Sequence, residues 1–176
     1  MKKFVCLLLI LALAIPAAAL AEEIDLSSYS VNALLELRNR IDLEIKNRSL
    51  EAQGKQKIEY WDFGSVSVCY QDFEVFTNNG KNYLAVKFSW INKQDEPATY
   101  TFEITVEAYQ NGIQLDTAYV YGYETDSLKK VLPWYEGKGV ELFELPNTTD
   151  DIVVYFGALF DFSGEYPAKS VIITTK

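Results

Sequence analysis

Four pairs of acidic residues carry the side chains most capable of chemistry in this chain. They are Asp95 with Glu96, Glu124 with Asp126, Asp150 with Asp151, and Asp161 with Glu165. Two carboxyl groups can hydrolyse a glycosidic bond when they face each other across a cleft at roughly 5 to 10 Å. Loop carboxylates can instead bind Ca²⁺, although the sequence contains no D-x-D-x-D-G loop. We interpret the pairs as surface charge and keep a carboxylate-dependent hydrolase as a remote alternative.

Other catalytic groups are scarce. The sequence contains no His, which excludes Ser-His-Asp and Cys-His triads and any His-ligated metal site. Of the two cysteines, Cys6 lies near the N-terminus, and Cys69 has Asp72 and Glu74 nearby, which would raise the pKa of its thiol. We therefore expect a non-catalytic protein with no metal or cofactor, in which Cys69 is partly buried and unreactive.

Aromatic side chains are the remaining candidates for a functional site. The chain has 12 Tyr, 10 Phe and 3 Trp, and rings with polar edges suit binding to a sugar or a protein. The candidate binding residues are Trp134, Tyr135 and Glu136, flanked by Tyr121 and Tyr123. We favour the alternative that Tyr119 and Tyr121 pack in the core and that Trp134 packs under its own loop.

The overall charge restricts the possible partners. Asp and Glu outnumber Lys and Arg by 25 to 16, which gives a net charge of -9. Phosphate backbones and anionic membrane surfaces repel such a chain. We expect no nucleic acid partner.

Residues 1–21 have the pattern of a secretory signal peptide. Lys2 and Lys3 precede an apolar run, and the small-residue sequence Ala19-Leu20-Ala21 fits cleavage before Glu22. A membrane anchor is the alternative, but a span needs roughly 20 apolar residues and this run is shorter. The residues before Cys6 also differ from a lipoprotein cleavage box. We expect a secreted or cell-envelope protein with no membrane span in its mature chain.

The next segment, residues 22–53, is predicted to contain an amphipathic helix over residues 31–53. Leu34, Leu37, Ile41 and Ile45 recur at helical spacing and form an apolar stripe. We favour docking of this stripe on the following domain, or loose tethering, over self-association as a short coiled coil. Residues 54–64 are predicted to be a linker.

Residues 65–176 have the alternation of an antiparallel β-sandwich of about seven strands. Apolar residues alternate over residues 84–90 and again over residues 98–108. Asn79-Gly80 and Asn111-Gly112 are favoured two-residue hairpin turns. The inward positions change from even to odd numbers near Gln71-Asp72, which indicates a β-bulge. Further strands are predicted over residues 113–121, 138–145, 152–160 and 169–175, and the whole suggests an immunoglobulin-like (Ig-like) sandwich.

A longer stretch of the chain resembles a known family. Residues 83–116, which end in Tyr109-Gln110-Asn111-Gly112-Ile113-Gln114-Leu115, are similar to secreted bacterial Ig-like domains of domain-of-unknown-function family 5067. The predicted helix is similar to one that precedes such domains. The resemblance implies an Ig-like fold and export, and it implies no activity. The family pattern has a Pro-Gly turn where this chain has Pro133-Trp134.

The sequence therefore predicts an exported, non-catalytic Ig-like module of the cell envelope or secreted fraction, with a binding or structural role. A carbohydrate-binding module that uses exposed aromatics near Trp134 is the alternative. The expected partner is a protein or glycan at the cell surface, and self-association through the helix stays open.

Overall fold

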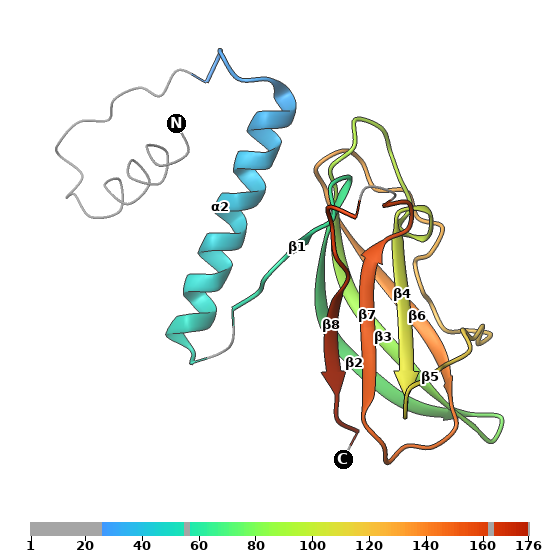
Figure 1. The fold of residues 1–176 in the computed structure, drawn as a ribbon. Helices are drawn as coiled ribbons and strands as arrows, with labels where there is room; N and C mark the ends of the chain where they lie inside the picture. The colour runs from blue at the N-terminus through green and yellow to red at the C-terminus, as the bar shows by residue number, and fades with distance from the viewer. Residues whose placement is uncertain (1–25, 55–56, 162–163, 176) are drawn as a thin grey trace. The chain divides into compact units, whose positions relative to one another are not determined.

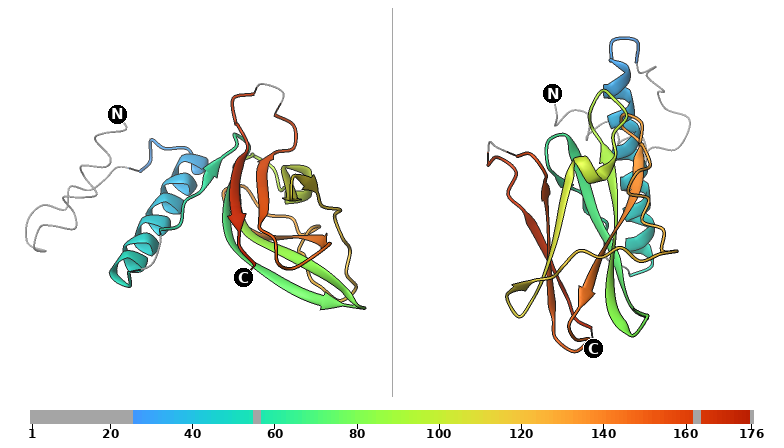
Figure 2. Two further views of the ribbon diagram at one scale, coloured as in Figure 1. Left: turned by 60° about the horizontal axis from the view of Figure 1, so that its bottom comes forward. Right: turned by 90° about the vertical axis from the view of Figure 1, so that its right-hand side faces the viewer.

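The computed structural model describes residues 26–54, 57–161 and 164–175 (Figure 1). The predicted signal peptide lies outside these residues. Most of the described chain forms two antiparallel sheets that pack face to face (Figure 2). The prediction of an all-β sandwich with one N-terminal helix is confirmed.

The first sheet has the strand order β1-β2-β3-β6, and the second has the order β5-β4-β7-β8. The strands of the first sheet are β1 (Trp61–Asp62), β2 (Val66–Asn78), β3 (Lys81–Asn92) and β6 (Glu136–Leu145). Those of the second are β4 (Ile104–Gln110), β5 (Ile113–Gln114), β7 (Ile152–Ala158) and β8 (Lys169–Ile173). Because β1 pairs with β2, the first sheet begins inside the segment predicted to be a linker.

Two hairpin turns follow the predicted chemistry. Asn79 and Gly80 have φ angles of 51° and 77°, and Asn111 and Gly112 have φ angles of 54° and 78°. Such pairs of positive φ angles match the right-handed twist of the strands on either side. The first turn joins β2 to β3 and the second joins β4 to β5.

The predicted bulge is also confirmed. The pairing of β2 with β3 shifts between Tyr70 and Asp72. The extra residue reverses the side to which later side chains of β2 point. As a result, Val68 before the bulge and Phe73 after it both pack on the same core.

The core lies between the sheets and is rich in aromatic rings. Leu84, Val86, Phe88 and Trp90 of β3 are all at most 1% exposed, as their alternation predicts. The second sheet contributes Ile152, Val154 and Phe156, each fully buried. The Phe88 ring lies edge-on to both Phe156 and Tyr100, with centroids 5.7 and 5.1 Å away.

The long strand predicted over residues 98–108 is wrong in its first half. A 3₁₀ helix, η1 (Tyr100–Phe102), replaces it, and β4 begins only at Ile104. The Tyr100 ring is buried and its hydroxyl donates to the Val140 carbonyl oxygen at 2.9 Å, whereas Phe102 is 64% exposed. Of the apolar residues in this segment, Tyr100 therefore lies in the core and Phe102 lies on the surface. The alternation of apolar residues in the sequence does not distinguish these two positions.

The strand predicted over residues 113–121 is also wrong beyond Gln114. After β5 the chain leaves the second sheet and reaches the edge of the first, where Thr117 forms an isolated bridge with Phe143. The backbone N–H of Ala118 donates to the Leu142 carbonyl oxygen at 2.7 Å.

Helix α2 (Val31–Ala52) agrees with the predicted helix. Ion pairs at i,i+4 spacing lie along it, Glu36 with Arg40 and Glu44 with Arg48, each at 2.8 Å. No helix in the described part of the chain is long and apolar enough to cross a membrane.

Candidate functional site

The most unusual segment of the sandwich is the connection between β5 and β6, which we call the long loop (residues 115–135). It contains no regular strand or helix. Loops of more than about 12 to 15 residues without secondary structure are uncommon in compact domains and frequently functional. Four of the five candidate residues from the sequence, all except Glu136, lie in it.

The long loop is tied to the sandwich by backbone hydrogen bonds. The N–H of Glu144 donates to the Asp116 carbonyl oxygen at 3.0 Å, and the N–H of Val131 donates to the Ala98 carbonyl oxygen at 2.8 Å. The Tyr100 hydroxyl also reaches the Thr125 carbonyl oxygen, at 3.3 Å. These hydrogen bonds attach the backbone of the long loop to the sandwich at several separated points, so the loop has a defined conformation.

Part of the long loop packs on the outer face of the first sheet. Val120, 6% exposed, forms a small buried cluster with Ala85 of β3 and Leu142 of β6. Tyr123 stacks on Phe76 with ring centroids 5.0 Å apart and an interplanar angle of 15°. Side chains of the long loop therefore cover part of the outer face of the first sheet, which is the face away from the main core.

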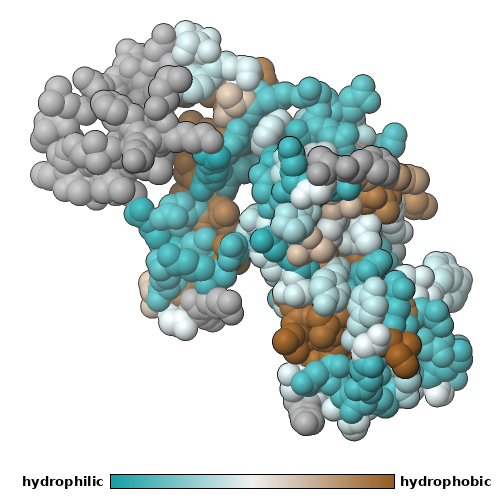
Figure 3. Space-filling model, in the orientation of Figure 1, coloured by the Kyte–Doolittle hydropathy of each residue, from teal (hydrophilic) through white to brown (hydrophobic). Residues whose placement is uncertain are grey.

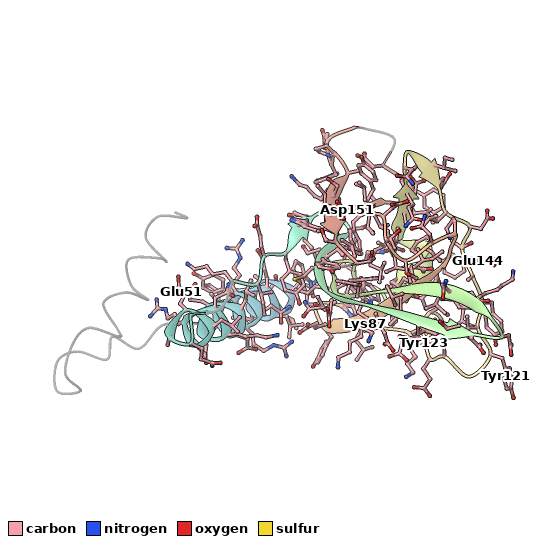
Figure 4. All side chains as sticks on the ribbon, turned by 90° about the horizontal axis from the view of Figure 1, so that it is seen from below. Glu51, Lys87, Tyr121, Tyr123, Glu144 and Asp151 are labelled. Atoms are coloured by element: carbon pink, nitrogen blue, oxygen red, sulfur yellow. The ribbon has the colours of Figure 1, made fainter. Side chains whose placement is uncertain are left out.

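The residues on either side of Val120 point into solvent. Tyr119 is 87% exposed and Tyr121 is 92% exposed, so the interpretation that they belong to the core is wrong. We call Tyr119, Tyr121 and Tyr123 the tyrosine surface. Figure 4 shows Tyr121 pointing away from the sandwich and Tyr123 closer to the strands.

Charged groups hold Tyr123 in place. The Tyr123 hydroxyl donates to Glu74 at 3.1 Å, and Glu74 pairs with Lys87 at 2.7 Å. The hydrogen bond from Lys87 lowers the pKa of Glu74. Burial, followed by the contact with Glu74, raises the pKa of Tyr123, so this hydroxyl stays protonated and donating at neutral pH.

The segment Trp134-Tyr135-Glu136 has a different environment. The Trp134 carbonyl oxygen accepts a hydrogen bond from Asn39 of α2 at 2.6 Å. The Arg38 guanidinium lies 4.7 Å from the centroid of the Tyr135 ring. Glu136 accepts a hydrogen bond from the Tyr60 hydroxyl at 2.8 Å. All three candidate residues therefore make contacts within the chain.

The structure thus separates the candidate residues that the sequence grouped together. Tyr123 lies beside Phe76 and the Ala85 cluster, whereas Glu136 pairs with Ile91 of β3. Six residues along a strand span roughly 20 Å. The structure does not bring Tyr121 and Tyr123 beside Trp134, because the long loop crosses the sheet between them, and the sequence does not show that crossing.

Trp134 also has an uncommon backbone conformation. Its φ angle is 61°, in the left-handed region that favours glycine. A half-buried Trp therefore holds a conformation that glycine usually adopts.

The contact with α2 uses an unexpected face of the helix. Asn39 and Asn47 donate to the carbonyl oxygens of Trp134 and Ile58. At 100° per residue, these asparagines lie opposite the predicted stripe of Leu34, Leu37, Ile41 and Ile45. Neither buried cluster of described residues includes an α2 side chain. α2 therefore contacts the rest of the chain through polar side chains, and the expectation that its apolar stripe makes the contact is wrong.

The other groups with potential chemistry do not converge. Within the described residues, no three acidic or thiol side chains are placed to hold a metal ion. Asp150 Oδ2 accepts hydrogen bonds from Asn111 and Asn147 at the end of the second sheet. Cys69 is 3% exposed, and burial raises the pKa of its thiol, so the predicted direction is right and its main cause differs.

Sequence reasoning missed the residues that shape the tyrosine surface. Val120 lies between two exposed tyrosines, and Phe76 follows Val75, which packs on the main core instead. The one available signal was the presence of Val120 between two tyrosines, because alternation places it on the opposite side from both.

Comparison with known proteins identifies the family. A family model described as a domain of unknown function, DUF5067, matches residues 43–157, more than half of the chain. The chain belongs to the DUF5067 family. The DUF5067 match begins inside α2 and ends within β7, so it includes the long loop and leaves β8 outside.

Solved structures with related shapes have low sequence identity. A β-sandwich protein of Clostridium difficile, described as uncharacterized, is 14% identical, with a TM-score of 0.48 over 67% of this chain and 90% of its own. A lipoprotein candidate of Bacillus subtilis is 11% identical, with a TM-score of 0.49 over 67% of this chain. This chain spans only 38% of that protein. A lipoprotein candidate of Staphylococcus aureus is 12% identical, with a TM-score of 0.46 over 65% and 92% of the two chains. No curated protein matches the chain significantly.

Proposed function

We propose that this protein is an exported, non-catalytic binding module of the cell envelope or secreted fraction, and that it recognises a protein or glycan through the tyrosine surface. One observation carries the proposal. Tyr119 and Tyr121 are 87% and 92% exposed on a loop that buried Val120 fixes between them. Both side chains are therefore held in solvent, where a ligand can reach them, by a loop that is anchored between them.

The chemistry of tyrosine supports this role. A Tyr side chain offers a large apolar face and a hydroxyl, and it loses little conformational entropy because only two torsions are fixed. The stack of Tyr123 on Phe76 and the hydrogen bonds of the long loop reduce the cost of ordering further. Export is supported by the pattern of residues 1–21, with basic residues, an apolar run and a small-residue cleavage motif.

Carbohydrate binding centred on Trp134 has less support. Its carbonyl oxygen accepts hydrogen bonds from Asn39 and Arg38, and Arg38 covers the neighbouring Tyr135 ring. A ligand that stacks on this face of the Tyr135 ring would have to displace Arg38. A carboxylate-dependent hydrolase also has less support, because the two surface clefts found among the described residues are lined by other acidic side chains than the candidate pairs.

The test measures binding of the exported chain to two probes, purified cell-wall polysaccharide of the host and detergent-extracted envelope protein of the host. Tyr119→Ala with Tyr121→Ala should weaken retention on one probe at least about tenfold, as loss of two central aromatic anchors does. Phe102→Ala, at a residue 64% exposed on η1, is the matched control and should bind like the wild type. Full binding by the double variant, or loss only in Trp134→Ala, would overturn the proposal.

A further inference from the structure

The exposed edge of the second sheet is the feature that this function leaves unexplained. β8 is the last strand in the order β5-β4-β7-β8, and among described residues it pairs only with β7. By contrast, the long loop covers the edge strand β6 of the first sheet through Asp116 and Ala118. An edge strand offers a row of backbone donors and acceptors to any strand that can reach it.

Edge strands usually carry features that prevent such pairing, and β8 has few of them. Proline, charged side chains and bulges are the common protective devices. β8 begins with one such charge, Lys169, but residues 170–175, Ser-Val-Ile-Ile-Thr-Thr, contain neither a proline nor a charge. The pairing of β8 with β7 is also continuous from Lys169 to Ile173 without a bulge.

The outer face of the second sheet has an apolar row that ends at this edge. Tyr109 of β4 lies opposite Val153 of β7, and Val153 lies opposite Ile172 of β8. Ile172 is 72% exposed, and Tyr155 packs edge-on against Tyr109 at 5.6 Å. Figure 3 shows a hydrophobic area on this face of the sandwich, over the lower part of the strands.

We propose that β8 pairs antiparallel with β8 of a second copy of this chain, centred on Ile172. In this register Ile172 faces Ile172 of the second copy, Val171 faces Ile173, and Ser170 faces Thr174. The apolar row of one copy, Tyr109, Val153 and Ile172, then joins the same row of the second copy. The result is one row of six side chains across the second sheets of the two copies. Opposed β-branched residues are favourable cross-strand pairs.

The choice of a second copy rests on this self-complementarity. Two copies of an acidic protein repel each other at long range, but the pairing line brings no carboxylate opposite another carboxylate. Each apolar residue of β8 faces an apolar residue, Ser170 faces Thr174, and Lys169 faces the uncharged Thr175. A strand of unrelated sequence would have to supply the same alternation of small polar and β-branched side chains to match it.

Sedimentation velocity of the exported chain over a wide concentration range tests the pairing. The wild type should show a monomer–dimer equilibrium, and Ile172→Lys should weaken the dimer at least about tenfold because it places two like charges opposite each other. Ile113→Lys is the matched control, because Ile113 is 71% exposed on the same sheet but lies away from β8. A wild type that stays monomeric, or an Ile172→Lys variant that dimerises as well as the wild type, would overturn the proposal.

A crosslinking experiment tests the register separately. Ile172→Cys should form a disulfide between two copies under mild oxidation, because directly opposed Cβ atoms lie about 4.5 to 5.5 Å apart. Ile113→Cys should not, and the buried native Cys69 should stay reduced in both variants. Equal crosslinking of the two variants would contradict the register. Neither result depends on the tyrosine surface.

Discussion

Two glycines of β6 make room for the largest rings of the core. A Cβ atom at Gly139 would lie 2.3 Å from Cζ of Phe88, and one at Gly137 would lie 2.7 Å from Nε1 of Trp90. The first distance is far inside van der Waals contact. Space, and not a special backbone angle, therefore requires glycine at these two positions.

Gly139→Ala should lower the free energy of unfolding by about 1 to 3 kcal/mol, because overpacking forces Phe88 out of its position. Urea denaturation followed by far-ultraviolet circular dichroism measures the change. Gly157→Ala is the control, because its Cβ would meet its nearest neighbour, Ala168, at 3.8 Å and needs no adjustment. Equal midpoints for the two variants would show that the Phe88 ring can move at little cost.

Glu141 gives the stability of the protein a pH dependence. Burial raises the pKa of its carboxyl above the ordinary value of 4.5, despite a nearby Tyr100 hydroxyl that lowers it. The folded chain then binds more protons than the unfolded chain once the pH rises above that value. Stability from this group is present in acid and falls as pH rises through the folded-state pKa.

Glu141→Gln should therefore raise the free energy of unfolding at about pH 7, where the wild type holds a half-buried charge. The advantage should disappear at pH values well below the ordinary pKa of the carboxyl. Glu124→Gln, at an exposed position of the long loop, controls for the loss of one charge. Parallel stability curves for the wild type and Glu141→Gln would contradict the assignment.

At the scale of elements, α2 is attached to the sandwich by side-chain amides. Asn47 both donates to the Ile58 carbonyl oxygen and accepts from its N–H, and Asn32 donates to Asp95 at 2.6 Å. Such bonds are directional but bury little apolar area. The helix can therefore separate from the sandwich at a lower cost than any strand.

Asn39→Ala should increase amide hydrogen exchange throughout α2 while the exchange of β3 stays unchanged, because the substitution removes the bond from Asn39 to Trp134 and the bond from Arg38 to Asn39, and neither involves β3. Hydrogen exchange with mass spectrometry measures both segments in one experiment. Asp42→Ala, at an exposed position of the same helix, should leave α2 as protected as in the wild type. Faster exchange in β3 would indicate that the helix supports the core.

The elements that sequence predicted correctly are those fixed by local chemistry. Asn79-Gly80 specifies its turn, and the change of inward parity near Gln71 specifies the bulge. The alternation of β3 is unambiguous because the inward side of the strand faces the core along its whole length.

The elements that sequence reasoning missed are fixed by distant contacts. Tyr100 ends the predicted long strand because its hydroxyl finds Val140 across the sandwich. Val120 turns the tyrosines outward because it meets Ala85 and Leu142 on a second small core. The aromatic residues of the candidate site could be predicted from the sequence. Their division between two places could not, because no local sequence pattern shows where the long loop crosses the first sheet.

At the scale of the whole molecule, cleavage of the predicted signal peptide sets the expected N-terminus of the mature chain. The predicted cleavage after Ala21 should give a mature N-terminus at Glu22, because Ala19-Leu20-Ala21 follows the small-residue rule of signal peptidase. Intact-mass measurement of protein from the native host decides this. A retained Met1 or a diacylglycerol on Cys6 would contradict it.

The buried thiol of β2 allows the rate at which the sandwich opens to be measured in the unmodified protein. Cys69 is 3% exposed, and its Sγ donates to the Tyr70 carbonyl oxygen and accepts from Gln71. A thiol reagent can reach it only when β2 separates from its surroundings. If Cys6 is removed with the leader, the rate of labelling reports the frequency of that separation without an engineered probe or a fluorophore.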